Sequence, residues 1–368
     1  MKKGWQTKSL GDVMRLEYGK PLDEVHRKHS GRFPIYGANG EKGRTDKFYC
    51  DKPSIIVGRK GSAGEINLAE SAFWPLDVTF FVTFDECKYD LRFLYYLLTA
   101  LELTKLAKGV KPGINRGEVY SKVVAVPELT EQQRIVAILD EAFAGIATAK
   151  ANAEKNLQNA RAIFESHLQA VFAKIDAKRA RLGDVAEVQS GGTPAVSNKS
   201  FWGGGIPWYS SGELNKVLTS ESERTISEMG LANSNAKLFP TGSLLIGMYD
   251  TAALKMSILD RDGAFNQAIA GVKPNERIDV EYVLHAINAK KQSLLLQRRG
   301  VRQKNLSLGK IKDIFVSLPA RQDQIKVVSE LRDIATETQR LESLYRRKLT
   351  ALAALKQSLL HQAFSGQL

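Results

Sequence analysis

The stretch Pro127-Glu128-Leu129-Thr130-Glu131-Gln132-Gln133-Arg134-Ile135 opens a segment that occurs twice in this chain. Its counterpart, 192 residues later, is Pro319-Ala320-Arg321-Gln322-Asp323-Gln324-Ile325-Lys326-Val327. The spacing of 192 holds without a gap from residues 127–172 to residues 319–364. The chain therefore contains an internal duplication, and this block is its most closely matched part.

Both copies of the block are predicted to form one long amphipathic helix. Residues 130–173 contain no proline and a single glycine, Gly145, and apolar side chains recur at alternating steps of four and three. A capping box of Thr130 and Gln133 is predicted to begin the first helix, and Asp323 the second. The apolar stripe of the first copy comprises Ile135, Leu139, Ala142, Ile146, Ala149, Ala153, Leu157, Ala160 and Phe164. That of the second copy comprises Val328, Leu331, Ile334, Ala335, Thr338, Leu341, Tyr345, Leu349, Leu352, Leu355 and Leu359.

Each predicted helix needs a partner for its apolar stripe. Forty-four or so residues give about 66 Å of helix, at about 1.5 Å per residue, and such a helix is not stable alone in water. The second helix begins in the second half of the chain and must return toward the first, so we expect the two to pair antiparallel. Small side chains at Ala149, Ala153 and Ala160 favour a close approach. The alternative is that each helix packs only on its own half of the chain.

The segments before the two helices are also related, but less closely. Leu10-Gly11-Asp12-Val13 matches Leu182-Gly183-Asp184-Val185 at a spacing of 172, whereas Ser54-Ile55-Ile56-Val57-Gly58 matches Ser243-Leu244-Leu245-Ile246-Gly247 at 189. Short β-rich runs separated by turns dominate both segments, with one helix expected at Leu91–Leu106. The second copy has gained residues before residue 264, so the duplication predicts two related but divergent modules.

The composition is ordinary for a globular chain except in its charge. Hydrophobic residues make up 43% and charged residues 25%, but the net charge is +13, with a basic excess in each half. Such a balance favours polyanions, chiefly nucleic acid, although solubility alone is an alternative. The two cysteines have no zinc-site spacing, and neither a leader nor a membrane-length apolar run is apparent. We expect a cytoplasmic protein without cofactor or metal.

Taken together, these repeated motifs resemble the specificity (S) subunit of type I restriction-modification systems over essentially the full chain. The resemblance rests on an ordered set of motifs that occurs twice, since no single motif is specific. They are Leu10-Gly11-Asp12 and Leu182-Gly183-Asp184, Pro34-Ile35-Tyr36-Gly37-Ala38-Asn39-Gly40, Gly58-Arg59-Lys60-Gly61-Ser62-Ala63-Gly64, the two segments quoted above, and Ala363-Phe364-Ser365-Gly366-Gln367-Leu368.

The resemblance implies an α+β fold with an internal pseudo-two-fold repeat. Two mixed α/β target-recognition domains, residues 1–128 and 177–319, are separated by long antiparallel helices at 129–176 and 320–368. Each domain is expected to read one half of a bipartite, asymmetric site in double-stranded DNA. The helix pair is expected to fix the spacing and to dock two methyltransferase (modification) subunits, with restriction/translocase subunits joining through the complex.

The candidate DNA contacts lie in turns. Gly58–Gly64 places Arg59 and Lys60 in a glycine-rich turn after an apolar run, where the backbone can approach a phosphate and arginine can bridge guanine O6 and N7. Residues 108–116 and 298–305 are basic turns at matched places. The predicted DNA-binding residues are Tyr36, Asn39, Arg59, Lys60, Lys111, Arg116, Tyr209, Tyr249, Arg299, Arg302 and Lys304. Burial in a core is the competing expectation for Trp208 and Tyr209.

Motifs for enzymatic chemistry are missing from the sequence. An adenine methyltransferase needs an Asn/Asp-Pro-Pro-aromatic turn, yet the chain has no Pro-Pro pair, and it has no phosphate-binding Gly-x-x-x-x-Gly-Lys-Ser/Thr loop. We therefore expect a non-catalytic subunit. The alternative from another class is a coiled-coil scaffold that joins two protein-binding domains, with the basic charge incidental.

Overall fold

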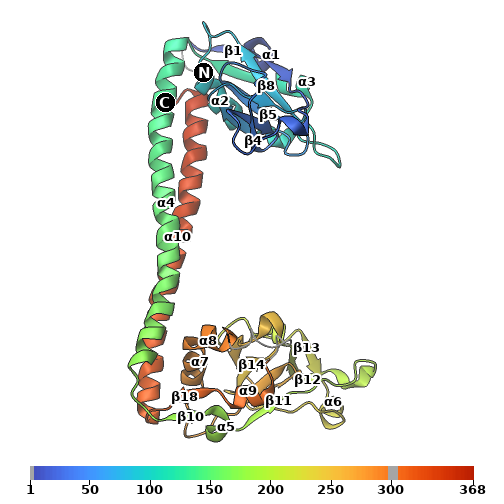
Figure 1. The fold of residues 1–368 in the computed structure, drawn as a ribbon, viewed down its shortest axis with the longest axis vertical. Coiled ribbons are helices and arrows are strands. Elements are labelled where there is room, and N and C mark those ends of the chain that lie inside the picture. The colour runs from blue at the N-terminus through green and yellow to red at the C-terminus, as the bar shows by residue number, and fades with distance from the viewer. Residues whose placement is uncertain (1–3, 297–305) are drawn as a thin grey trace. The chain divides into compact units, whose positions relative to one another are not determined.

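The computed structural model describes residues 4–296 and 306–368. The chain divides into two compact units: residues 1–155 together with 345–368, and residues 156–344. Each unit contains one sheet-rich module and one part of each long helix, α4 (Leu129–Lys174) and α10 (Arg321–Ser365) (Figure 1). The mixed α+β class predicted from the sequence is confirmed.

The module of the first unit is built from short strands and helices. They are β1 (Gln6–Ser9), α1 (Leu10–Val13), β2 (Met14–Tyr18), η1 (Glu24–His26), β3 (Phe33–Gly37), β4 (Gly40–Thr45), β5 (Ser54–Gly58), β6 (Ile66–Ala69), β7 (Trp74–Pro75), β8 (Thr79–Phe84), α2 (Leu91–Ala100), η2 (Leu103–Leu106), α3 (Arg116–Tyr120) and β9 (Val123–Val126). The four-stranded antiparallel sheet has the order β2-β8-β5-β6. A three-stranded sheet β4-β3-β7 and the ladder β1-β9 complete the module.

The module of the second unit repeats this topology with additions. Its elements are β10 (Arg179–Arg181), α5 (Leu182–Val185), β11 (Val188–Ser190), η3 (Lys199–Phe201), β12 (Trp202–Tyr209), η4 (Ser211–Glu213), β13 (Arg224–Ile226), α6 (Glu228–Ala232), β14 (Leu244–Gly247), η5 (Asp250–Ala252), β15 (Met256–Ile258), β16 (Ala264–Phe265), β17 (Ile269–Val272), α7 (Val280–Ala289), α8 (Lys291–Leu296), α9 (Leu308–Lys312) and β18 (Phe315–Ser317). Its sheets, β11-β17-β14-β15, β13-β12-β16 and β10-β18, match those of the first unit strand for strand. The residues gained by the second copy fall around β12, β13 and α6.

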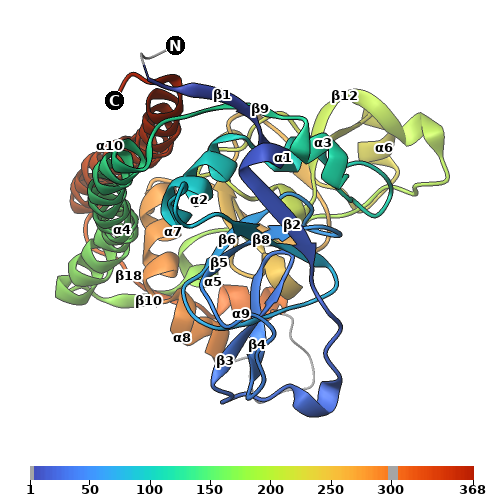
Figure 2. The ribbon, with the colours of Figure 1, turned by 90° about the horizontal axis from the view of Figure 1, so that it is seen from above.

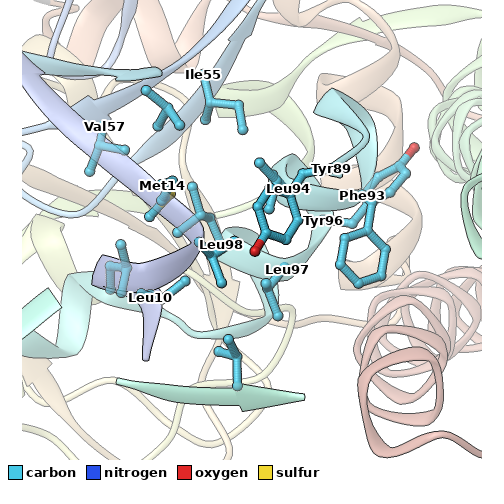
Figure 3. Packing of buried hydrophobic residues seen from close by; sticks show 14 of the residues in the cluster. Leu10, Met14, Ile55, Val57, Tyr89, Phe93, Leu94, Tyr96, Leu97 and Leu98 are labelled. Carbon is cyan, nitrogen blue, oxygen red and sulfur yellow. The ribbon is translucent and has the colours of Figure 1, made fainter. Parts of the chain in front are cut away.

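A single apolar core joins each module to the long helices. In the first unit, side chains of β2 and β5 pack with those of α2 (Figure 3). The same cluster includes Phe80 and Val82 of β8 and continues onto Ile135 and Leu139 of α4 and Leu360 of α10. In the second unit, Val328 of α10 belongs to the core and Phe172 of α4 packs against it. The helices are therefore stabilised by burial against a module as well as against each other.

Antiparallel pairing of α4 and α10 is visible within each unit. In the first, Arg134 donates a hydrogen bond to the carbonyl oxygen of Leu368, and Lys356 lies 5.1 Å from the ring centre of Phe143. In the second, Arg161 lies 3.3 Å from the carboxylate of Glu342. Every position of the predicted stripe in α4 is buried or half-buried, and Ala153 and Ala160 are at most 2% exposed. In α10, Leu355 departs from the prediction, because 46% of it is exposed.

The starts of both long helices differ from the sequence-based expectation. The amides of Glu131 and Gln132 donate to the carbonyl oxygen of Glu128, so the first turn begins before Thr130. Neither Thr130 nor Gln133 caps the helix. The second helix likewise begins with bonds to the carbonyl oxygen of Ala320, so Asp323 lies inside the first turn.

A buried glutamine replaces the predicted caps in both copies. The side chain of Gln132 accepts a hydrogen bond from the amide of Asp90 at 2.9 Å and donates to the carbonyl oxygens of Lys88 and Pro127. Gln324, 192 residues later, makes the same three bonds to Asp279, Arg277 and Pro319. Asp90 and Asp279 in turn cap α2 and α7. We call this arrangement the glutamine clasp; it ties each module to the beginning of its own long helix.

The helix predicted at Leu91–Leu106 is wrong in its second part. α2 ends at Ala100, and Glu102 adopts a left-handed backbone conformation with φ 47° before the short η2. A left-handed residue breaks the helical hydrogen-bond ladder, which lets Leu103 enter the core. No described helix is long and apolar enough to cross a membrane.

Candidate nucleic-acid interface

The backbone of the first glycine-rich turn is packed so closely that two of its glycines have no room for a side chain. A Cβ on Gly58 would lie 2.1 Å from the carbonyl oxygen of Ser62, and one on Gly64, whose φ is +84°, would lie 2.4 Å from backbone atoms of Leu103 and Thr104. The amide of Gly64 donates to the carbonyl oxygen of Gly58 and closes the turn. Arg59 and Lys60 therefore project from a rigid backbone that follows the buried strand β5.

A second turn, residues 108–116, is hydrogen-bonded to the first. The amide of Gly61 donates to the carbonyl oxygen of Pro112 at 2.8 Å, and the amide of Ile114 donates to that of Arg59 at 3.2 Å. Lys111 is exposed at the tip of the turn. Asn115 caps α3 through the amide of Gly117, which places Arg116 at the first position of that helix. The two basic turns predicted from the sequence thus form one surface in the first unit.

Tyr18, at the end of β2, joins the two turns. The guanidinium groups of Arg59 and Arg116 each lie 5.3 Å from the centre of its ring. Arg59 also donates to the carbonyl oxygen of Asp77 through Nε and Nη2, at 3.0 and 2.6 Å, and Tyr18 remains 48% exposed. Stacking on the ring reduces the freedom that the arginines lose when they bind an anion.

A shallow cleft lies over these residues and is lined by Tyr18, Arg59, Lys60, Phe80, Ile114 and Arg116. Within residues 4–296 and 306–368, none of the ion pairs involves Arg59, Lys60, Lys111 or Arg116. Lys108, by contrast, pairs with Glu118. Lys111 is exposed at the tip of the second turn and does not line the cleft. We call Tyr18, Arg59, Lys60 and Arg116 the arginine cleft. It combines uncompensated positive charge with an exposed aromatic face, which suits phosphates and bases.

Tyr36 and Asn39 lie on the neighbouring hairpin and have different surroundings. Tyr36 is half-buried, packs edge-on against Phe73 at 5.9 Å, and donates to the carbonyl oxygen of Leu68; burial raises the pKa of its hydroxyl. Asn39 is exposed in the two-residue turn between β3 and β4. The carbonyl oxygen of Ala38 would lie 2.8 Å from a Cβ on Gly58, so this turn abuts the glycine-rich turn although neither residue lines the cleft.

The described residues at the corresponding surface of the second unit do not repeat this cationic arrangement. Leu306 donates its amide to the carbonyl oxygen of Met248, as Ile114 does to Arg59, so the buried Met248 takes the place of Arg59. Tyr249, 36% exposed, follows it at the place of Lys60, and Leu308 begins α9 where Arg116 begins α3. Arg299, Arg302 and Lys304 lie outside the described residues.

Tyr209 is placed in the core and not at a surface. It is 2% exposed within a cluster with Phe239 and Phe265, and its hydroxyl donates to the carbonyl oxygen of Ser220 at 3.0 Å. Trp208, also buried, donates to the carbonyl oxygen of Gly192. Its burial therefore argues against direct DNA contact by Tyr209, and both residues pack in a core, as the competing expectation had it.

Two features of the surfaces were missed by sequence reasoning. Tyr18 follows no recognisable motif, and its only signal is its place at a strand end before Gly19. In the second unit, the guanidinium of Arg224 stacks 3.5 Å from the ring centre of Trp202 across the β12–β13 hairpin. Such a contact depends on strand register, which the sequence does not reveal. Within the described parts of the chain, no cluster of three or more His, Cys, Asp or Glu side chains is arranged to hold a metal ion.

Comparison with known proteins identifies the class of this duplicated fold. The sequence profile of the type I restriction modification DNA specificity domain matches residues 2–158 and again residues 174–348. The chain therefore belongs to this family of type I specificity proteins, with two copies of the domain.

Individual relatives carry the same description. The EcoR124I/EcoR124II specificity subunit of Escherichia coli is 26% identical over 273 residues, covering 69% of this chain and 65% of the relative. The EcoDI specificity subunit of Escherichia coli is 20% identical over 411 residues, covering 99% of this chain and 88% of the relative. The MjaIX specificity subunit of Methanocaldococcus jannaschii is 25% identical, covering 41% of this chain and 36% of the relative. The first of these matches thus spans just under two thirds of its relative, and the last about one third.

Two solved structures share the fold. One is a chain from a structure that describes complex assembly and conformational transition of the type I R-M system, with a TM-score of 0.81, 17% identity, and coverage of 100% of this chain and 99% of that one. The other is the HsdS subunit from Thermoanaerobacter tengcongensis, with a TM-score of 0.66, 17% identity, and coverage of 100% and 98%. At these identities the likeness concerns the fold.

Proposed function

We propose that this chain is the DNA-recognition subunit of a type I restriction-modification complex. Each module reads one half of a bipartite, asymmetric site in double-stranded DNA. The pair of long helices sets the number of base pairs between the halves and docks two modification subunits, through which restriction/translocase subunits join. The chain itself performs no chemistry; the methyl transfer belongs to the modification subunits.

The arginine cleft of the first unit carries this proposal. Three of its members are cations on two turns that a network of backbone bonds holds together, and the exposed ring of Tyr18 supports both arginines. Phosphate contacts from such cations supply affinity and orientation, whereas base contacts supply sequence discrimination. A protein-binding scaffold has no need for uncompensated charge on a rigid glycine-rich turn.

The second module is proposed to read different bases by different contacts. At matched positions, Met248, Tyr249 and Leu308 replace Arg59, Lys60 and Arg116, so these three described positions do not offer the same chemistry. Arg224, stacked on Trp202 and exposed, and Tyr249 are the described side chains that we propose for base contact. Two unlike readers on a duplicated frame imply an asymmetric recognition sequence.

Selection of bound sequences from a random duplex library tests this function. The chain is assembled with its modification subunits, and bound duplexes are recovered at several salt concentrations. We expect enrichment of two short motifs separated by a fixed, unspecified gap, and binding that weakens steeply as salt rises. Assembly without any sequence enrichment contradicts the proposal and favours the scaffold.

A further inference from the structure

The junction between module and long helix contains a second contact beside the glutamine clasp. α2 packs against α4 in the first unit (Figure 2), and α7 packs against α10 in the second. The clasp is the same in both units, so its residues show which positions of the two junctions are equivalent. Residues of α2 correspond to those of α7 at a spacing of 189, and residues of α4 correspond to those of α10 at a spacing of 192. About two helical turns beyond the clasp, the two junctions differ.

In the first unit an arginine of the module meets an aspartate of the long helix. Nη2 of Arg92 lies 3.1 Å from Oδ1 of Asp140, and the hydroxyl of Tyr96 donates to the same carboxylate. The Asp140 side chain is 33% exposed. Phe143, on the next turn of α4, packs edge-on against Tyr96 at 5.3 Å.

In the second unit the charges are exchanged. The Nε–H of Arg332 is shared between the two carboxylate oxygens of Glu281 in the module, at 3.0 and 3.1 Å, and Nη2 donates to the same carboxylate. The Glu281 side chain is only 13% exposed. His285 takes the position of Tyr96, with its Nε2 3.8 Å from the Glu281 carboxylate, and the ring of Phe164 from α4 faces it at 6.0 Å.

Arg92 and Glu281 correspond in the repeat, as do Asp140 and Arg332. From this reversal we infer that the ion pair specifies which module each long helix accepts. The glutamine clasp holds a module of either copy, whereas the ion pair is attractive only when the module docks on the helix that follows it in this chain. This inference concerns module docking and does not depend on the DNA that the modules read.

The physical basis is the partial burial of the carboxylate in each pair, which is greater for Glu281 than for Asp140. A module of the second kind docked on α4 brings Glu281 to Asp140, and a module of the first kind docked on α10 brings Arg92 to Arg332. Two like charges in a half-buried contact repel each other, or one must lose its charge. Repulsion between like charges disfavours a module on the wrong helix, and this adds to the discrimination that attraction on the correct helix provides.

Charge reversals in the full chain test the pairing itself. Arg332→Asp is expected to lower the melting temperature of the second unit by about 5 °C, and Glu281→Arg in addition is expected to restore most of the loss by rebuilding the pair of the first unit. Asp140→Arg with Arg92→Glu is the matched cycle in the first unit. Lys326→Asp, at an exposed cation of α10 whose ion pair is with Asp323 of the same helix, is the control for net charge. Additive effects in both cycles overturn the inference.

A module exchange tests the discrimination. In this chimera, a second copy of residues 177–319 takes the place of residues 1–128, so that both modules are of the second kind. The Glu281 of the copy in the first position then faces Asp140 of α4. We expect that chain to gain soluble yield and about 5 °C in melting temperature when it carries Asp140→Arg, and the gain to vanish when the new first module also carries Glu281→Gln. Equal stability with Asp140 and with Asp140→Arg overturns the inference. If the chimera folds neither with Asp140 nor with Asp140→Arg, the charge-reversal cycles provide the test. Non-additive effects of the two reversals on the melting temperature support the inference, and additive effects refute it.

Discussion

At the scale of single residues, the arginine cleft depends on one tyrosine. Tyr18 lies between Arg59 and Arg116, both 5.3 Å from its ring centre. It orders two flexible cations before any ligand arrives, and ordering a long side chain in advance reduces the entropy lost on binding. Motif reading found both arginines but not the ring that supports them.

Removing both arginines tests the proposed interface. The double variant Arg59→Ala with Arg116→Ala is expected to weaken DNA binding about tenfold or more and to reduce the magnitude of the slope of log affinity against log salt by about 1 to 2, since each lost phosphate contact removes about 0.9. The measurement is a titration of duplex DNA at several salt concentrations, with modification subunits present.

The control for that titration changes the same number of charges elsewhere in the first unit. Lys52→Ala with Lys88→Ala removes two exposed lysines that pair with Glu86 and Asp85 and do not line the cleft. An equal loss of affinity in both double variants contradicts a specific interface and indicates only a general charge effect.

The glutamine clasp gives a second prediction at this scale. Gln132→Ala leaves the amide of Asp90 and two carbonyl oxygens without their partner, so we expect the free energy of unfolding of the first unit to fall by about 2 to 4 kcal/mol. Gln133→Ala, on the neighbouring exposed position, is the matched control and is expected to change it by less than about 0.5 kcal/mol. Chemical denaturation of the two variants measures the difference; similar values for both exclude the clasp as a stabilising contact.

At the scale of elements, the long helices were predictable because their pattern is strong. Every position that the alternating steps of four and three predicted along α4, from Ile135 to Phe164, is buried or half-buried, although the buried Val136 lies outside that stripe. The starts of the helices were not predictable from the sequence. Sequence rules assign caps from neighbouring residues, whereas Gln132 bonds to residues 88 and 90, which are far away in the sequence. The same limit applies to the site: the turns carrying Arg59 and Arg116 were identified, but the burial of Tyr209 depends on packing between segments far apart in sequence.

The ion pair between α7 and α10 predicts a specific response to acid. Burial of the Glu281 carboxyl raises its pKa, but the adjacent His285 and Arg332 outweigh this and hold that pKa at about 2, against an ordinary value of 4.5. Because the folded pKa is lower than the unfolded one, the stabilisation is fully present above about pH 4.5 and is lost as pH falls toward 2. The loss amounts to at most about 3 kcal/mol.

Glu281→Gln tests that response. We expect the variant to be less stable than the parent chain at pH 6 and the difference to shrink steadily between pH 4.5 and 2, measured by denaturation at each pH. Glu276→Gln, an exposed position before α7, serves as the reference for loss of one carboxylate. A constant difference between Glu281→Gln and the parent across that range contradicts the assignment.

At the scale of the whole molecule, the duplication is the organising feature. The two modules repeat the same sheets, the same clasp and the same type of ion pair, yet their exposed turns carry different side chains. This combination matches a frame that stays constant while its readers diverge. The sequence predicted the repeated helices because the 192-residue spacing holds without a gap from residues 127–172 to 319–364. It did not predict the exchange of charges at the junctions.

The proposed role of the helices as a spacer gives a prediction about DNA. Inserting seven residues into both α4 and α10 preserves the apolar stripe and lengthens each by about 10 Å. We expect the preferred gap between half-sites to grow by about 3 base pairs, at about 3.4 Å per base pair. The gap is read from bound-sequence selection, and an unchanged gap refutes the spacer role.

The assignment of one half-site to each module is tested most directly by a map of methylated adenines in cells that carry this chain with its modification subunits. Two chains are compared: the parent, and one whose residues 1–128 come from another specificity protein. We expect a split, asymmetric methylated motif in the parent and a change in only one of its halves after the exchange. A single uninterrupted motif, or a change in both halves, contradicts the assignment of one reader to each module.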